Sequence, residues 1–255
     1  PALIINVQRG GPGLGGIQPS QADYWQATKA TGHGDFQILV FAPSTVQEMV
    51  DFVSLAFDLG DKYRMPAMIL ADGMLGQMME PVEFKDQGEN AKIDKPWALT
   101  GHQFKRPHNV VNSLYLKPAD LERLVKERFE RYETIKKTEQ RAEEYLVDDA
   151  DIVVVAYGAS SRVARSAVNA ARAEGIKAGL IRPITLWPFP TDALQRAAQH
   201  VKKFLAVEMS MGQMVDDVRL AIHDQKPVEF YGRTGGMIPT PAEVLGAVKK
   251  AGGVL

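Results

Sequence analysis

The chain has 255 residues, of which 45% are hydrophobic and 24% charged, and its 30 basic and 31 acidic residues leave a formal charge of −1. This composition predicts one large or two modest globular units with buried cores, and the near-zero charge provides no attraction to nucleic acid or to an anionic membrane. No apolar run approaches the ~20 residues that cross a bilayer, and no signal segment is evident, so the sequence predicts a cytoplasmic protein.

Strands and helices alternate in the first part of the chain. We predict strands at 3–7, 37–42 and 68–70, and helices at 20–30 and 44–59. Ser20 is expected to open the first helix, and Ser44 to cap the second, with Gln47 at the capping-box position and Gly60 at its end. Because each strand is a continuous apolar run, the pattern predicts a mostly parallel sheet covered on both faces.

A glycine-rich loop with one arginine follows the first strand. Arg9 comes directly before Gly10 and Gly11, and further glycines stand at 13, 15 and 16. A guanidinium is a planar fork of donors that suits a carboxylate, and glycines let backbone N–H groups approach the same small anion. Arg9 is therefore a candidate anion-binding residue. The alternative is an exposed arginine at a strand end with a flexible loop behind it.

The middle of the chain is less regular. Polarity rises between 85 and 117 and prolines appear at 96, 107 and 118, which predicts an irregular excursion over the surface. A charged helix is expected from Pro118 to about Glu144, with a narrow apolar stripe. That stripe packs on its own domain, or else the helix bridges two domains or docks on a partner subunit.

From residue 151 the alternation is regular again. We predict strands at 152–158, 178–181, 204–207 and 227–231, and helices at 160–174, 191–199, 213–223 and 241–250. This part is long enough to hold a core of its own.

Several residues at predicted strand ends and turns are further candidates for ligand binding. Asp72 ends a predicted strand, where open α/β sheets bind ligands, so it is a candidate for substrate or magnesium; a turn aspartate is the alternative. The turn from Tyr157 to Ser161 suits either a phosphate or an N-cap serine. Glu208 is expected to cap the next helix or to cross an interface. No histidine has a convincing metal-ligand spacing, so no metal site is predicted.

Seven motifs, in chain order, resemble the alpha subunits of the 2-oxoacid:ferredoxin oxidoreductases, which are thiamine-diphosphate enzymes. They lie at 8–12 (QRGGP), 33–35, 43–48, 66–73, 75–81, 181–190 and 207–214, and the fifth is most similar to the 2-ketoisovalerate type. The resemblance implies two α/β units: the back part of a pyrimidine-binding-like domain (1–93), a linker with the long helix (94–148), and a transketolase C-terminal-like domain (149–255). Because alpha subunits of this family begin well upstream, we expect a fragment.

The resemblance also implies an enzyme. Its reaction is the oxidative decarboxylation of a 2-oxoacid, such as 2-ketoisovalerate, to acyl-coenzyme A with ferredoxin as electron acceptor. Arg9 would bind the substrate carboxylate, His33 and Asp72 are further candidates for catalysis, and Gly10 and Gly11 for cofactor contact. The alternatives are another thiamine-diphosphate enzyme subunit, of transketolase or 2-oxoacid dehydrogenase type, and a non-catalytic assembly module.

Two features that the sequence lacks indicate that partner subunits carry the remaining chemistry. The sequence has no cysteine, so it can hold no iron–sulfur cluster, disulfide or cysteine-ligated zinc. It also lacks the Gly-Asp-Gly pattern with a downstream asparagine pair that holds Mg²⁺ and diphosphate in thiamine enzymes. We therefore expect thiamine diphosphate with Mg²⁺ to be anchored mainly by a beta-type subunit, and clusters to lie on other subunits. Further expected partners are a gamma-type subunit, a ferredoxin or ferredoxin-like subunit, the 2-oxoacid and coenzyme A. The chain alone is expected to be inactive.

Overall fold

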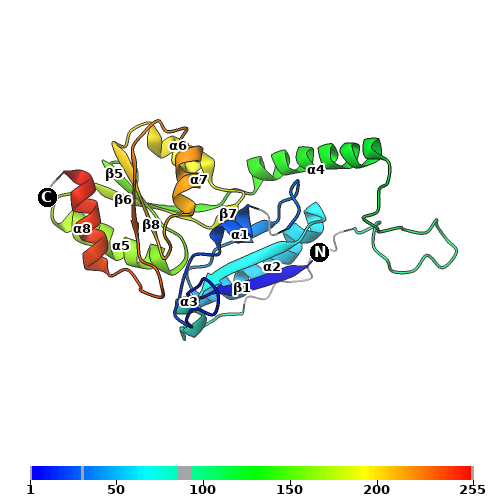
Figure 1. Ribbon diagram of the computed structural model, residues 1–255, viewed down its shortest axis with the longest axis horizontal. Helices are drawn as coiled ribbons and strands as arrows, with labels where there is room; N and C mark the ends of the chain where they lie inside the picture. Colours follow the sequence, from blue (N-terminus) through cyan, green and yellow to red (C-terminus); the bar gives the residue numbers. More distant parts are fainter. Residues whose placement is uncertain (1, 30–31, 85–93, 254–255) are drawn as a thin grey trace.

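The computed structural model describes residues 2–29, 32–84 and 94–253, which form two sheets with helices around them (Figure 1). The first sheet has the order β1-β3-β2-β7, in which β1 (Leu3–Gln8), β3 (Ala67–Asp72) and β2 (Leu39–Phe41) are parallel. Its last strand, β7 (Thr185–Trp187), is antiparallel to β2 and comes from the C-terminal half of the chain. The predicted parallel strands are therefore present, and β7 is an addition that the sequence did not indicate.

The second sheet has the order β4-β6-β5-β8-β9. Strands β6 (Ala178–Pro183), β5 (Ile152–Val155), β8 (Lys203–Glu208) and β9 (Val228–Gly232) are parallel, and β4 (Ala142–Tyr145) is antiparallel to β6. Helices α5 (Gly158–Ala173) and α8 (Pro241–Gly252) share one apolar cluster with this sheet. Helices α6 (Thr191–Ala198) and α7 (Met214–Ala221) pack on the alternate residues of the same strands, so the sheet is covered on both faces.

One apolar core joins the two sheets. It contains Leu39 and Phe41 from β2, Leu186 and Trp187 from β7, and Phe204 from β8, together with α6 and α7. The predicted boundaries at 93 and 148 stay a prediction, but the two parts are in direct contact through this core and through β7.

Helix α2 (Val46–Tyr63) differs from its prediction at both ends. Thr45, and not Ser44, accepts the Glu48 N–H as N-cap, and Gly60 lies buried inside the helix. The helix ends at Arg64, whose φ of 50° and ψ of 56° are left-handed. Helix α1 (Tyr24–Thr28) is shorter than expected, and Ser20 does not cap it; residue 30 of that prediction lies outside the described residues. Helix α3 (Gly73–Gln77) follows β3 directly.

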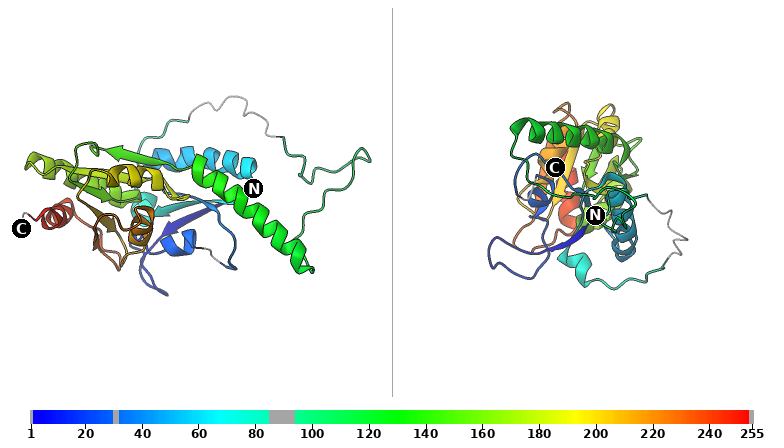
Figure 2. Two further views of the ribbon diagram at one scale, coloured as in Figure 1. Left: turned by 90° about the horizontal axis from the view of Figure 1, so that it is seen from above. Right: turned by 90° about the vertical axis from the view of Figure 1, so that its right-hand side faces the viewer.

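Helix α4 (Pro118–Thr138) projects from the body of the molecule at its N-terminal end (Figures 1 and 2). Its C-terminal end packs on the first sheet, where Tyr132 meets the Trp187 ring edge-on with centroids 5.3 Å apart. The helix does not run on to Glu144 as predicted, because Ala142–Tyr145 pairs with β6 as β4. Among the described residues 94–117, no helix or strand is present, in agreement with the predicted irregular excursion; residues 85–93 of that prediction lie outside the described residues. In the described part of the chain, no helix is long and apolar enough to cross a membrane.

Candidate functional site

The candidate site lies at the carboxyl ends of β1 and β3. The two strands are paired in register, with Gln8 opposite Asp72, so Arg9 and Gly73 leave the sheet side by side. Gln8 is buried and fixes this corner, because its amide donates to the Ala71 carbonyl at 3.2 Å and accepts from the Asp23 N–H at 3.0 Å. This is the edge at which open α/β sheets bind ligands.

Arg9 folds back on its own glycine loop. The guanidinium Nη1 donates to the carbonyls of Gly10 (3.0 Å) and Leu14 (2.7 Å), and Nη2 donates to that of Gly13 (3.2 Å). Gly15, with φ of 45°, must be a glycine, because a Cβ there would lie 2.0 Å from the Gly10 oxygen. The Nε–H and one N–H of Nη2 have no partner among the described residues, and Arg9 is exposed. The loop thus presents a positioned cation with free donors.

A second glycine pair supports this loop from the other half of the chain. Gly235 and Gly236 follow β9 and lie against Gly10, which is buried and donates its N–H to the Gln18 carbonyl at 2.7 Å. A Cβ on Gly236, whose φ is 91°, would come within 2.4 Å of the Gln18 Cβ. These two glycines were not among the predicted site residues, although a Gly-Gly pair after a strand is a recognised turn signal.

Asp72 joins the two halves of the chain. Its Oδ1 accepts from the Met74 and Leu75 N–H groups, each at 3.1 Å, and caps α3. Its Oδ2 accepts from the Ala159 N–H at 3.0 Å, at the start of α5. Burial raises the pKa of this carboxyl, and the three N–H donors oppose that rise. Both oxygens are therefore engaged, and only 1% of the residue is exposed.

The start of α5 consequently has a different cap from the predicted serine. Tyr157 stands at the N-cap position without a side-chain cap, and the anion that meets the helix is the Asp72 carboxylate. Ser160 instead donates to the Oε1 of Gln21 at 2.8 Å. The predicted alternatives for this turn, a phosphate or an N-cap serine, are thus replaced by a carboxylate from the neighbouring sheet.

Gln21 is the residue at the contact of the two halves that sequence reasoning missed. It is fully buried, donates from Nε2 to the Tyr157 carbonyl at 2.9 Å, and accepts the Met209 N–H on Oε1 at 3.0 Å. Nothing local in the sequence marks it, because its partners are more than 130 residues away. Nearby, the Tyr24 hydroxyl donates to Asp217 at 2.5 Å, and Lys29 pairs with the same carboxylate.

Glu208 caps the next helix, which is one of the two predicted possibilities. It is buried at the end of β8 and accepts the N–H groups of Gln213, Met214 and Val215, and it also accepts from the Ser210 hydroxyl. Burial raises its pKa, and these donors oppose the rise.

His33 lies apart from this edge. It is exposed and belongs to the connection that enters the amino end of β2, whereas Arg9, Gly10, Gly11 and Asp72 lie at the carboxyl edge of the same sheet. Within the residues described by the structure, no group of three or more His, Cys, Asp or Glu side chains is arranged to hold a metal ion.

Two family descriptions match this chain. Residues 1–147 match the thiamine-diphosphate-binding domain of pyruvate flavodoxin/ferredoxin oxidoreductases, and residues 150–244 match the pyruvate:ferredoxin oxidoreductase core domain II.

Individual proteins are also similar. The ketoisovalerate oxidoreductase subunit VorB of Methanothermobacter thermautotrophicus is 48% identical over 253 residues, which are 99% of this chain and 71% of that protein. Among solved structures, the 2-oxoglutarate:ferredoxin oxidoreductase of Magnetococcus marinus has a TM-score of 0.75 at 22% identity, over 98% of this chain and 48% of that one. A split-gene transketolase has a TM-score of 0.52 at 18% identity, over 84% of this chain and 57% of that one. These likenesses confirm the predicted α/β, transketolase-like fold class.

Proposed function

Because this chain belongs to the 2-oxoacid:ferredoxin oxidoreductase family, we propose that it is one subunit of an enzyme that oxidises 2-ketoisovalerate or a similar branched 2-oxoacid. The reaction is the oxidative decarboxylation of the 2-oxoacid to acyl-coenzyme A, with ferredoxin as electron acceptor. The observation that carries the proposal is the 48% identity to a ketoisovalerate oxidoreductase subunit over nearly the whole chain. The family assignment sets aside the alternatives of a transketolase or a 2-oxoacid dehydrogenase subunit.

In this proposal, Arg9 binds the substrate carboxylate. Its guanidinium is held at the carboxyl edge of the sheet by three carbonyls of the glycine loop, and two N–H donors stay available. A carboxylate accepts a pair of parallel N–H groups from one guanidinium, so these donors can fix both the position and the orientation of a 2-oxoacid. Gly10, which supports the loop, already donates its N–H within it, so Gly11 is the better candidate of the two for contact with a bound group.

Asp72 has a positioning role in this proposal. Because Asp72 is buried and each of its oxygens accepts backbone N–H groups, it is not accessible to Mg²⁺ or substrate. Its contribution is to hold the start of α5 against the edge that carries Arg9. His33, at the opposite edge of the sheet, would reach the substrate only through a partner or another part of the protein, and we do not assign it a role in the reaction.

The family binds thiamine diphosphate, which supplies the group that attacks the 2-oxo carbon. The described residues of this chain do not fit the diphosphate and Mg²⁺ end of that cofactor, because Asp72 is buried with both oxygens bound to backbone N–H groups and those residues hold no cluster of three metal-ligating side chains. We therefore propose that a beta-type subunit anchors this end, and that the present chain forms the wall that holds the substrate carboxylate.

Electron transfer is also assigned to partners. Iron–sulfur clusters are held by cysteine thiolates, and the 255 residues contain none. We propose that the clusters lie on a ferredoxin-like subunit or on ferredoxin itself, and that a gamma-type subunit completes the assembly.

The test is a substrate panel with the purified complex. Reduction of ferredoxin, or of a viologen dye in its place, would be followed with coenzyme A and one of three acids: 2-ketoisovalerate, pyruvate or 2-oxoglutarate. We expect kcat/KM to be highest for 2-ketoisovalerate by at least ~tenfold, a difference of ~1.4 kcal/mol in transition-state binding. A complex that prefers 2-oxoglutarate or pyruvate by that margin would contradict the proposed substrate. A complex inactive on all three acids, yet intact in its subunits, would favour the assembly-module alternative.

A further inference from the structure

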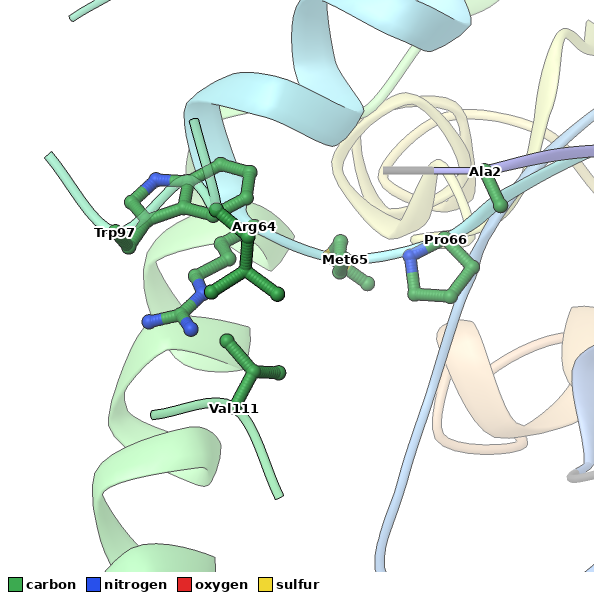
Figure 3. A pocket seen from close by; sticks show the side chains of 7 residues that line it. Ala2, Arg64, Met65, Pro66, Trp97 and Val111 are labelled. Carbon is green, nitrogen blue, oxygen red and sulfur yellow. The ribbon is translucent and has the colours of Figure 1, made fainter. Parts of the chain in front are cut away.

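Two adjoining cavities lie far from the Arg9 loop along the chain and share one residue, Arg64. The first has a volume of about 350 Å³ and an apolar lining that includes Met65, Pro66, Trp97 and Val111. Figure 3 shows Trp97, Arg64 and Val111 gathered at one end of this cavity and Pro66 and Ala2 at the other. The second has a volume of about 360 Å³ and is lined by segment 112–115 and α4. Each volume falls in the range of small-molecule sites.

The second cavity concentrates positive charge. Arg64, Arg128 and Arg131 line it, with Glu127 as its one carboxylate, and Glu127 is already paired with Arg123 at 2.7 Å. Within the described residues, no carboxylate lies within ion-pair distance of any of the three arginines. Within the same residues, Arg128 donates to the Asp35 carbonyl, at 3.1 Å, and to no other group. Arginines that converge without acidic partners are typical of sites for phosphate or carboxylate groups.

Two further observations indicate that this cavity suits an anionic group. The Nε of Arg131 is buried and has no hydrogen-bond partner among the residues that the structure describes, which is costly for a charged donor unless a ligand satisfies it. Arg64 occupies the left-handed position that ends α2, where a helix usually has glycine. Its guanidinium lies 4.9 Å from the centre of the Trp97 ring, at the junction of the two cavities. A strained backbone position filled by arginine is expected where the side chain itself has a function.

We propose that the two cavities form a nucleotide site. A planar base fits the apolar cavity beside Trp97, and the phosphate groups fit the cavity of Arg64, Arg128 and Arg131. A ligand with only phosphate would leave the apolar cavity unused, and an apolar ligand would leave three cations unpaired. The nucleotide comes from a free nucleoside diphosphate or from the nucleotide end of coenzyme A, which share a base and a diphosphate. The site does not depend on the proposed role of Arg9.

The test is calorimetric titration of the 255-residue chain with ADP, coenzyme A, adenosine and inorganic pyrophosphate. We expect saturable binding of ADP or coenzyme A with a Kd below ~1 mM, and binding of adenosine and of pyrophosphate at least ~tenfold weaker. Arg131→Gln and Arg128→Gln should each weaken nucleotide binding at least ~tenfold, and Trp97→Leu should weaken it as well. Lys126→Gln is the matched control: it removes the same charge from α4, but at an exposed residue paired with Glu122, and should leave the Kd within ~twofold.

Comparison of the four ligands distinguishes a free nucleotide from coenzyme A and shows which results overturn the proposal. Equal affinity for ADP and coenzyme A would identify a free nucleotide as sufficient. At least ~tenfold tighter coenzyme A would identify coenzyme A as the ligand, held also by groups beyond the shared base and diphosphate; both results support the site. Absence of binding by either, or pyrophosphate binding as tight as ADP, would overturn it. Unchanged affinity in both arginine variants would overturn it too. Circular dichroism of each variant ensures that a loss of binding is not a loss of fold.

Discussion

Replacement of Asp72 by alanine tests the junction between the two halves of the chain. The substitution removes the acceptor of three backbone N–H groups, of which those of Leu75 and Ala159 are buried. A buried donor left without a partner costs ~1–3 kcal/mol, and the lost helix cap contributes within the same range. Relief of the buried charge offsets part of this, since burial already raises the pKa of the Asp72 carboxyl. We expect the free energy of unfolding to fall by ~3 kcal/mol, a large share of the 5–15 kcal/mol typical of proteins.

Asparagine at the same position separates the two contacts. Its side-chain oxygen can still cap α3 through the Met74 and Leu75 N–H groups, but its amide then faces the Ala159 N–H with another donor. Asp72→Asn should therefore cost less than Asp72→Ala, ~1–2 kcal/mol, and the loss should fall on the contact between the halves. Asp216→Ala, at an exposed carboxylate paired with Arg219, is the matched control and should change stability by less than ~0.5 kcal/mol.

The assay is urea unfolding at neutral pH, followed by circular dichroism and tryptophan fluorescence. The midpoint and the slope together give the free energy of unfolding. If Asp72→Ala lowers it by less than ~1 kcal/mol, or no more than Asp216→Ala does, the carboxylate does not hold the two halves together and this reasoning is refuted.

Four other predictions concern the site and the assembly. In the reconstituted complex, Arg9→Ala should reduce transition-state stabilisation, measured from kcat/KM, by ~3 kcal/mol. Arg9→Lys should reduce it by more than the loss of a single hydrogen bond implies, because lysine keeps the charge but loses the paired N–H donors of the guanidinium. Near-normal kinetics of Arg9→Ala would show that another group holds the carboxylate. Calorimetric titration of the isolated chain with thiamine diphosphate and Mg²⁺ should show no tight binding, and a submicromolar Kd would contradict partner anchoring. Burial raises the pKa of the Asp72 carboxyl in the folded state above its ordinary value of 3.8, so between these two values the folded protein binds more protons than the unfolded protein. The free energy of unfolding should therefore fall as pH rises from 3.8 through the raised pKa, and Asp72→Asn should remove this fall. Identical profiles of urea midpoint against pH for the two proteins would refute this prediction. Limited trypsin digestion should cut first within 94–117, after Lys105, and early cuts within 151–207 would show that the linker is misplaced.

The predictions that held rest on local signals. Apolar runs such as 152–155 and 204–207, and the helices that follow them, are visible in the sequence because burial on both faces of a parallel sheet imposes continuous hydrophobicity. The QRGGP motif likewise led to the loop that carries Arg9 at the carboxyl edge of the sheet.

The predictions that failed depend on contacts between distant segments. The sequence AEEY of β4 looks like a continuation of α4, but its Glu143 pairs with Arg182 on β6, which it meets only through the sheet. Ser44 is as good a cap as Thr45 by composition, and the Glu48 carboxylate that binds the Ser44 N–H also binds Arg182. Asp72 was visible as a strand end, whereas its partner at Ala159 was not. Propensity cannot anticipate such partners, because tertiary contacts override it.

The place of β7 in the first sheet has a consequence for synthesis on the ribosome. Strand β2 reaches its outer neighbour only when Trp187 has emerged, about 145 residues after Phe41, which at 5–20 residues per second takes roughly 7–30 s. During that interval the outer edge of β2 presents unpaired N–H and C=O groups, the arrangement that recruits foreign strands. The outer edge of β2 is therefore completed only when translation delivers β7.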